Sequence, residues 1–400
     1  MLEPPPADDR TFACRLSPSG EGGVGLIELQ GPRSAEILQR LFVNPRGRRA
    51  DAMTPGRLLY GKLFRQGEFL DEVLLERAPD EEAPAYVINC HGGAVAGRRV
   101  VDALIAEGAV CLTWAERLAI RCRQGALDAL QARAAELLPG ALTLRAAAML
   151  LDQYHGALSV ALRQIIATLR QGGDSAAPMQ CLRDLLRTAP FGRALIDPPT
   201  LALAGRPNVG KSTLGNALLR FERMIVHPRP GTTRDTIEET LAIRDLPFRL
   251  VDTAGLRAAE DAVEADGVER SLAALRLADI ALLVFDASVP LQPEDRRALQ
   301  AAAGRVLPVL NKSDLPRVLD SAEIRRLTGL DPVPVCALTG AGLPALEKAL
   351  VALAYPHIPP RGAPVLFTAA QETALRQALE LLERRDAAGA IRMLEASLKT

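Results

Sequence analysis

The sequence predicts an N-terminal α+β domain, a helical domain, and an α/β domain built on a doubly wound sheet. Three observations support this division. Short alternating segments fill the first 115 residues, helical segments rich in Ala, Leu and Arg follow, and a glycine-rich loop then opens a run of alternating strands and helices. We expect domains at residues 1–115, 116–195 and 196–357, and C-terminal helices at residues 358–400 that complete the helical domain.

The composition has no extreme of charge. Lys plus Arg and Asp plus Glu each total 48, so net charge predicts no strong non-specific attraction to nucleic acid. The six cysteines contain no Cys-x2-Cys pair, which predicts neither a zinc site nor a disulfide framework and favours a reducing cytoplasm. No apolar run approaches the roughly 18 residues that span a bilayer. We therefore expect a cytoplasmic protein without a membrane segment.

The first region alternates predicted strands and helices. Strands are predicted by alternating patterns at residues 23–29, 58–64, 72–75 and 85–89, and helices by the spacing of residues 34–42 and 94–107. The motif Cys90-His-Gly-Gly93 has no second His or Cys at ligand spacing. We interpret it as a turn that ends a strand, in which glycine permits a close approach of the backbone to a ligand.

The second region is predicted to be helical. Apolar residues recur at three- and four-residue steps between residues 144 and 169, which predicts at least two packed helices. Residues 188–199 contain Pro190 and a Pro-Pro pair. We expect them to break the helical pattern and to form the boundary before the glycine-rich loop.

The glycine-rich loop reads Gly205-Arg-Pro-Asn-Val-Gly-Lys-Ser212 and stands between a predicted strand and a predicted helix. Backbone amides at such a helix N-terminus bind phosphate groups, and the flanking elements disfavour an ordinary glycine loop. Lys211 would contact the β- and γ-phosphates, and Ser212 would ligate Mg²⁺. Nucleotide contacts are predicted for Gly205, Asn208, Val209, Gly210, Lys211, Ser212 and Thr213.

Two further motifs belong at the carboxyl ends of the predicted sheet strands, which lie at residues 236–243, 248–251, 280–285, 306–310 and 333–337. In Pro230-Gly-Thr-Thr-Arg-Asp235, Thr233, with Thr232 as the alternative, would ligate Mg²⁺ and sense the γ-phosphate. In Asp252-Thr-Ala-Gly255, Asp252 would lie near the metal through water, and the Gly255 amide would meet the γ-phosphate. Changes of order in these segments would supply a nucleotide-dependent switch.

The motif Asn311-Lys312-Ser-Asp314 predicts recognition of guanine. The Asp314 carboxylate would accept hydrogen bonds from guanine N1–H and N2–H₂, a donor pair that adenine lacks, so the site would select GTP over ATP. Cys336-Ala337-Leu338 would place a main-chain amide at guanine O6. Together, the five motifs predict a P-loop GTPase domain that binds GTP and GDP.

The residue that activates the attacking water is less evident. Leu256 stands where Ras-like proteins carry the glutamine that orients water. Glu264 is a catalytic candidate in addition to Lys211, because a carboxylate can orient water. The alternative interpretation is that Glu264 belongs to a solvated acidic loop. No arginine finger is evident, so another cation is needed. Asn208, with carbonyl groups of residues 224–229, could hold K⁺ there.

These motifs resemble the tRNA-modification GTPases called MnmE or TrmE. The phosphate loop, Pro230-Gly-Thr-Thr-Arg-Asp235, Asp252-Thr-Ala-Gly-Leu-Arg257 and Val263-Glu-Ala-Asp-Gly-Val-Glu-Arg270 match that family's G domain. The N-terminal half is similar at Gly22-Gly-Val-Gly-Leu-Ile-Glu-Leu-Gln-Gly-Pro32, Leu70-Asp-Glu72 and Cys90-His-Gly-Gly93. Together these similarities cover most of residues 10–115 and 196–356.

The resemblance implies several properties. It implies homodimers, binding of a formyl-tetrahydrofolate by the N-terminal domain, K⁺ held by Asn208, and Glu264 as the catalytic glutamate. It also implies a flavoprotein partner, MnmG or GidA, with which the family adds a carboxymethylaminomethyl group at the wobble uridine of tRNA.

The chain also departs from the family pattern. It has no cysteine after Cys336, whereas the family usually ends in Cys-x-Gly-Lys. Residues 110–117 differ from the usual Arg-Pro-Gly-Glu-Phe segment, and the Ser-Thr-Gly-Glu signature before Cys90 is missing. These departures leave GTP hydrolysis as an expectation and two hypotheses for its use: wobble-uridine modification, or a divergent regulatory GTPase that switches partner binding without modification.

Overall fold

The computed structural model describes residues 10–17, 22–78, 84–172, 175–221, 224–225, 239–251, 275–276, 278–302 and 304–399. The chain divides into two compact units, residues 1–128 and 129–400. Within the described ranges, no helix is both long enough and apolar enough to cross a membrane.

The first unit contains a seven-stranded sheet with the order β3-β4-β5-β6-β2-β1-β7. Its strands are β1 (Phe12–Arg15), β2 (Val24–Gln30), β3 (Phe42–Val43), β4 (Leu58–Arg65), β5 (Glu68–Arg77), β6 (Ala85–His91) and β7 (Val110–Leu112). Neighbouring strands pair antiparallel except β1 and β7, which are parallel. The sequence pattern located the four longer strands of this sheet, whereas β1, β3 and β7 are too short to show an alternation.

The described residues of the first unit also form the helices α1 (Ser34–Leu41), α2 (Ala94–Ala106) and α3 (Trp114–Arg123) and the 3₁₀ turn η1 (Ala50–Ala52). Buried residues of α1 and α2, including Ile37, Leu38 and Leu104, form one apolar core with the sheet. α3 begins with a capping box between Thr113 and Glu116. The first unit therefore includes α3, beyond residue 115.

In the double glycine after β6, Gly92 packs closely against another segment of the backbone. A Cβ atom on Gly92 would lie 2.0 Å from the carbonyl oxygen of Gly22, whereas one on Gly93 would meet nothing within 4 Å. The first glycine is therefore required by a close approach of two chain segments. Within the described residues the approaching group at Gly92 is Gly22.

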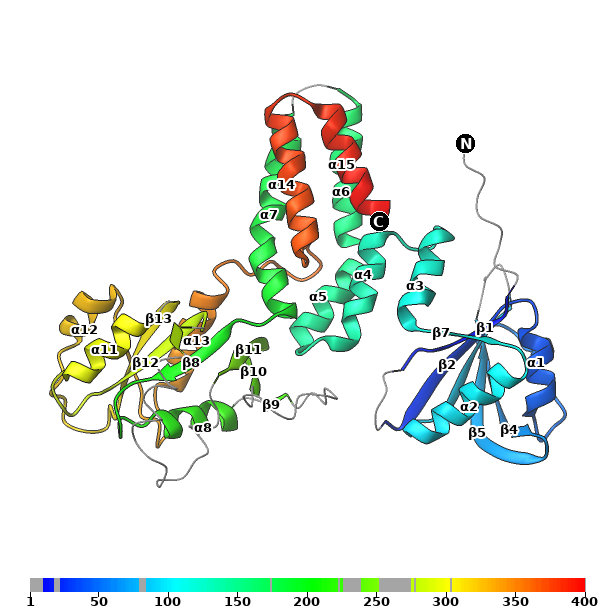
Figure 1. Cartoon of the computed structure of the whole chain (residues 1–400), viewed down its shortest axis with the longest axis horizontal. Coiled ribbons are helices and arrows are strands. Elements are labelled where there is room, and N and C mark those ends of the chain that lie inside the picture. Colours follow the sequence, from blue (N-terminus) through cyan, green and yellow to red (C-terminus); the bar gives the residue numbers. More distant parts are fainter. Residues whose placement is uncertain are drawn as a thin grey trace. The chain divides into compact units, whose positions relative to one another are not determined.

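The second unit contains another seven-stranded sheet, with the order β14-β13-β12-β8-β11-β10-β9. Its strands are β8 (Thr200–Ala204), β9 (Met224–Ile225), β10 (Glu239–Ile243), β11 (Leu246–Leu250), β12 (Ile280–Asp286), β13 (Arg305–Asn311) and β14 (Val333–Pro334). The five strands from β14 to β11 are parallel, and β10 pairs antiparallel with both its neighbours. β8 is the central strand (Figure 1).

Both faces of this sheet are buried. Along β12, Leu282 and Val284 belong to one apolar core, whereas Leu283 and Phe285 belong to another. A parallel strand that is covered on both sides is apolar without alternation, as the residues of β12 are. The helices of this region within the described residues are α8 (Lys211–Phe221), α11 (Pro293–Ala301), α12 (Ser321–Thr328) and α13 (Leu343–Ala354). The predicted doubly wound P-loop fold is confirmed.

The helical part of the second unit joins segments from both ends of its sequence. It comprises α4 (Ala129–Leu137), η2 (Leu138–Gly140), α5 (Leu144–Tyr154), α6 (Ala157–Arg170), α7 (Ala176–Ile196), α14 (Ala369–Glu383) and α15 (Ala387–Lys399). α14 packs along α7, and α15 packs along α6 (Figure 1). Gly156, with a φ of 96°, separates α5 from α6.

The predicted break at residues 188–199 is wrong, because α7 continues through Pro190 to Ile196. Tertiary contacts explain this continuity. Thr188 Oγ1 accepts a hydrogen bond of 3.0 Å from the Leu366 amide, and a Cβ on Gly192 would lie 2.1 Å from the Leu366 carbonyl oxygen. Phe191 and Leu195 are also buried. This packing of the returning chain on α7 outweighs the cost of an internal proline.

Candidate functional site

The glycine-rich loop joins the central strand β8 to α8, at the carboxyl edge where ligands bind in doubly wound sheets. Three of its residues have positive φ angles: Gly205 at 150°, Asn208 at 61° and Gly210 at 95°. A Cβ on Gly205 would lie 2.3 Å from the Val284 carbonyl oxygen. Only glycine fits such a position, so the loop's shape depends on its sequence.

Lys211 is the first residue of α8, and its ammonium group lies inside this loop. Its Nζ donates to the carbonyl oxygens of Gly205, at 2.8 Å, and Arg206, at 2.9 Å. Burial lowers the pKa of the Lys211 ammonium group. A desolvated cation at a helix N-terminus favours an anion, so the geometry fits a polyphosphate that would take Lys211 from these two carbonyl groups.

Hydroxyl and amide groups suited to cations lie around Lys211. Ser212 and Thr213 are exposed on the first turn of α8, and Asn208 is exposed in the loop. Hydroxyl oxygens suit Mg²⁺, which is usually held by a few protein oxygens together with phosphate and water. No three His, Cys, Asp or Glu side chains gather into a metal site within the described residues. The assignment of Ser212 as a Mg²⁺ ligand stays a prediction from the sequence.

Asn311, the last residue of β13, connects the loop with a second segment. Its Nδ2 donates to the Val209 carbonyl oxygen at 2.7 Å, and its Oδ1 accepts from the Ala337 amide at 3.0 Å. Asn311 is buried, and a Cβ on Gly210 would lie 2.3 Å from its Nδ2. The predicted phosphate-binding and base-binding motifs therefore lie against each other through this one side chain.

The other residues of the predicted base-recognition motif follow Asn311 in the chain. Asp314 is exposed, with its carboxylate accessible to a ligand. Lys312 has a φ of 59°, and its Nζ lies 2.7 Å from Asp286 Oδ2. This Lys312–Asp286 pair joins the predicted base-recognition segment to the end of β12.

Cys336 and Ala337 follow the last parallel strand, β14, which ends at Pro334. The Cys336 amide donates to the Ala341 carbonyl, and the Ala337 amide donates to Asn311. Both amides thus have partners inside the chain, and Leu338, which follows them, is 83% exposed.

Five predicted site residues lie outside the described residues: Thr232, Thr233, Asp252, Gly255 and Glu264. The structure therefore brings together the phosphate loop, Lys211, Asn311, Lys312, Asp314 and the segment at Cys336. The groups that would ligate Mg²⁺ beside Ser212, and the carboxylate that would orient water, stay predictions from sequence.

The sequence analysis gave no role to three charged residues of this site: Arg206, Asp286 and Asp295. Asp286 ends β12, and Asp295 lies in the first turn of α11. Both carboxyl groups are buried, as is most of the Arg206 side chain. One signal was available in the sequence. An aspartate that ends a fully apolar parallel strand stands at the ligand-binding edge of the sheet, where burial of a carboxylate requires a reason.

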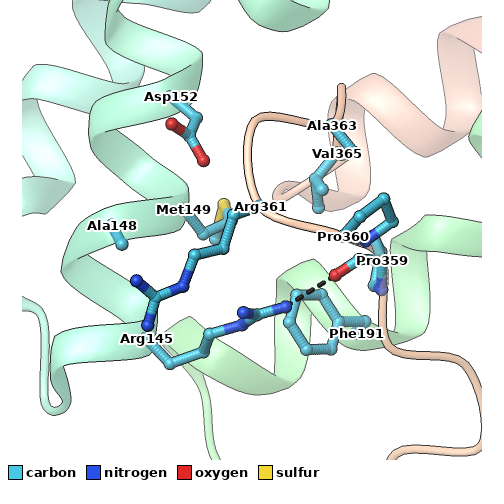
Figure 2. A pocket seen from close by; sticks show the side chains of 10 residues that line it. All are labelled: Arg145, Ala148, Met149, Asp152, Phe191, Pro359, Pro360, Arg361, Ala363 and Val365. Carbon is cyan, nitrogen blue, oxygen red and sulfur yellow. Dashed lines mark hydrogen bonds between the residues drawn. The ribbon is translucent and has the colours of Figure 1, made fainter.

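A separate pocket lies away from these motifs. Figure 2 shows it between α5, α7 and the segment at residues 359–365. There Arg145 donates to the Pro359 carbonyl oxygen at 2.6 Å and lies over the Phe191 ring. None of the residues that line this pocket belongs to a nucleotide motif.

Known proteins resemble parts of this chain. A family model described as "50S ribosome-binding GTPase" matches residues 200–312. Among solved structures, the G domain of the T. maritima FeoB iron transporter is 25% identical, covers 39% of this chain and 98% of that chain, and has a TM-score of 0.28.

Curated relatives extend the similarity over both units. The tRNA modification GTPase MnmE of Geobacillus kaustophilus is 36% identical over 376 residues, covering 86% of this chain and 81% of that protein. The MnmE proteins of Listeria innocua and Bacillus subtilis are 37% and 34% identical, over 86% of this chain and 81% and 82% of those proteins. Identity at this level over most of both proteins shows that the chain belongs to the MnmE family of tRNA modification GTPases.

Proposed function

We propose that this GTPase binds GTP with Mg²⁺ at the phosphate loop and that its hydrolysis of GTP supports the modification of wobble uridines in tRNA. One observation carries the assignment of the site. Asn311 joins the Val209 carbonyl of the phosphate loop to the segment at Ala337, so groups suited to the phosphates and to guanine lie side by side. The family relationship supports the link with tRNA.

In this proposal each residue of the site has one task. Lys211 leaves the carbonyl oxygens of Gly205 and Arg206 and contacts the β- and γ-phosphates, where its charge stabilises the charge of the transferred group. Asp314 accepts hydrogen bonds from guanine. Ser212 and Thr233 ligate Mg²⁺, with Asp252 acting through water, and Glu264 orients the attacking water as a carboxylate.

We further propose that the active protein is a homodimer and works with an MnmG-like flavoprotein. The sheet of the first unit supports a partner surface. Leu58, Tyr60 and Leu74 are 60%, 42% and 41% exposed, and Tyr60 pairs directly with Leu74 across β4 and β5. Exposed apolar side chains gathered on one sheet are typical of a protein interface, and a second copy of this chain is the proposed occupant.

The six cysteines are free, which agrees with a reducing cytoplasm. Formyl-tetrahydrofolate stays a proposal that rests on the family alone.

Nucleoside mass spectrometry of tRNA tests the function. Deletion of the gene should remove 5-substituted wobble uridines, and the wild-type gene should restore them. Lys211→Ala should not restore them, because the phosphate contact is lost, whereas Lys348→Ala, which changes an exposed lysine on α13, should. An unchanged nucleoside profile on deletion, in a strain without a second family member, would instead indicate a regulatory GTPase that does not support modification.

The proposed K⁺ site has a separate test. GTP hydrolysis should be at least about tenfold faster in KCl than in NaCl, because a fitted cation stabilises the developing charge. Asn208→Gly should remove this difference while allowing the loop's φ of 61°. Asn216→Gly changes an exposed asparagine on α8 and should retain it. Equal rates in the two salts for the wild type would contradict the K⁺ assignment.

A further inference from the structure

Four charged side chains meet beneath the phosphate loop. Arg206 belongs to the loop, Asp286 ends β12, Asp295 lies on α11, and Lys312 belongs to the base-recognition segment. The cluster therefore joins the two halves of the proposed nucleotide site to the body of the sheet. Its two cations and two carboxylates balance in charge, which allows burial.

Asp286 is the centre of this cluster. Its Oδ2 lies 2.7 Å from Lys312 Nζ, and its Oδ1 accepts from the amide of Ser288, at 2.9 Å, and from its hydroxyl, at 2.6 Å. Burial alone would raise the pKa of the Asp286 carboxyl, but the hydrogen bonds from Lys312 and Ser288 hold it below the usual value. Asp286 is therefore a buried anion with firm partners on one side.

Arg206 lies on the other side of Asp286, at longer range. Its Nη2 is 3.9 Å from Asp286 Oδ2, and its Nε is 3.8 Å from Asp295 Oδ2. These two nitrogens, like Asp295 Oδ1, are buried and have no hydrogen-bond partner within the described part of the chain. The distances exceed those of hydrogen bonds, so the guanidinium is attracted by both carboxylates but not yet bonded to either.

The backbone of the same arginine is coupled to the phosphate contact. The Arg206 carbonyl accepts a hydrogen bond from Lys211, which would leave it when a polyphosphate binds. Arg206 can then adjust, and a shift of about 1 Å would bring its guanidinium within hydrogen-bond distance of the carboxylates. Because buried unpaired donors are costly, closing these contacts would stabilise the nucleotide-bound loop.

We propose that Arg206, held between Asp286 and Asp295, is a positioning residue that fixes the phosphate loop against the base-recognition segment when nucleotide binds. Asp286 is the shared anchor, because Lys312 and Arg206 approach the same carboxylate oxygen. The inference rests on the proposed phosphate-loop site and adds to it a coupling between recognition of phosphate and recognition of base. Neither Arg206 nor Asp286 needs to contact the nucleotide for this coupling.

The test replaces Arg206 in the full-length protein and follows the release of fluorescent GDP. Arg206→Met should accelerate GDP release and raise KM for GTP by about tenfold, while kcat changes little, since the loop's binding geometry is lost and not the reacting groups. Arg206→Lys should restore much of the affinity, because a cation returns between the two carboxylates. The matched control is Arg296→Met on α11, whose arginine pairs with Glu323 at 3.0 Å on the surface.

A merely structural role would give a different pattern. If Arg206→Met lowered the melting temperature but left GDP release and KM at wild-type values, the proposal would be overturned. Asp295→Asn keeps the shape of its side chain and should also accelerate GDP release, and it replaces Arg206→Met if that variant does not fold. The double variant Arg206→Met/Asp295→Asn should release GDP no faster than the more affected single variant.

The same series separates this inference from the assignment of the site. Lys211→Ala should abolish measurable GDP binding. If Lys211→Ala binds GDP normally, the proposed site itself is wrong. Suppose that Lys211→Ala does not bind GDP, while Arg206→Met and Asp295→Asn release GDP at the wild-type rate. The assignment of the site is then supported, and only the positioning role of Arg206 is wrong.

Discussion

Each of the two sheets is associated with a largely buried arginine, and the two arginines are held in opposite ways. In the first unit, Arg117 of α3 donates to Glu28 Oε2 at 2.7 Å, Glu28 Oε1 at 3.0 Å and Gln30 Oε1 at 2.7 Å. It also lies over the Phe12 ring. In the second unit, Arg206 remains 3.8 Å and 3.9 Å from its carboxylate partners.

The difference separates a completed contact from one that can still change. Arg117 is 2% exposed, and it holds α3 on β2 through hydrogen bonds that are already formed. Arg206 lies in the phosphate loop, where Lys211 donates hydrogen bonds to two carbonyl oxygens. A bound polyphosphate would take Lys211 away from these oxygens. An ion pair with formed hydrogen bonds favours one arrangement, whereas an ion pair at longer range permits two.

The largest expected effect is on the stability of the first unit. Arg117→Met should lower its free energy of unfolding by about 3 to 5 kcal/mol, because Glu28 becomes a buried charge without its cation. Urea unfolding followed by the fluorescence of Trp114 measures this, since the chain's only tryptophan begins α3.

Two variants sharpen the contrast with Arg206. Arg117→Met/Glu28→Leu should recover most of the stability, since it removes both charges. Arg206→Met without nucleotide should cost less than Arg117→Met, because Asp286 keeps Lys312 and Arg206 lies beyond hydrogen-bond distance of both carboxylates. A loss as large as that of Arg117→Met would mean that the two arginines have equivalent structural roles.

A smaller effect is expected from an ion pair in the first unit between an exposed histidine and a buried aspartate. His91 Nδ1 lies 2.5 Å from Asp71 Oδ1, and the His91 side chain is 69% exposed. The hydrogen bond and the charge of Asp71 raise the pKa of the His91 imidazole. A raised pKa in the folded state contributes stability below the ordinary value of about 6.5, and this contribution is lost as pH rises through the folded-state pKa.

The first unit should therefore become slightly less stable between about pH 6 and pH 8, and His91→Gln should remove this dependence. The urea midpoint from Trp114 fluorescence, measured across that range, gives the result. His155→Gln, in the second unit, should leave the dependence unchanged. A pH slope that persists in His91→Gln would assign it to another group, and solvent screening keeps the expected effect small.

Much of the fold could be predicted because its signals are local. The apolar run of β12 and the loop that ends in Lys211 each lie within a few consecutive residues, so their sequence predicts a strand and a phosphate-binding turn. Pro190 misled the prediction for the opposite reason. Its local preference is to end a helix, but contacts with residues 365–367, far along the chain, keep α7 intact.

The sequence by itself determined the family, the doubly wound sheet and the order of the nucleotide motifs, because each depends on residues that are neighbours in the chain. Only the tertiary structure decided which distant charges meet. Arg117 and Glu28 are 89 positions apart, and Arg206, Asp286 and Asp295 come from a loop, a strand end and a helix. Burying a charged side chain costs little free energy only when an opposite charge lies next to it, and the tertiary fold brings these opposite charges together.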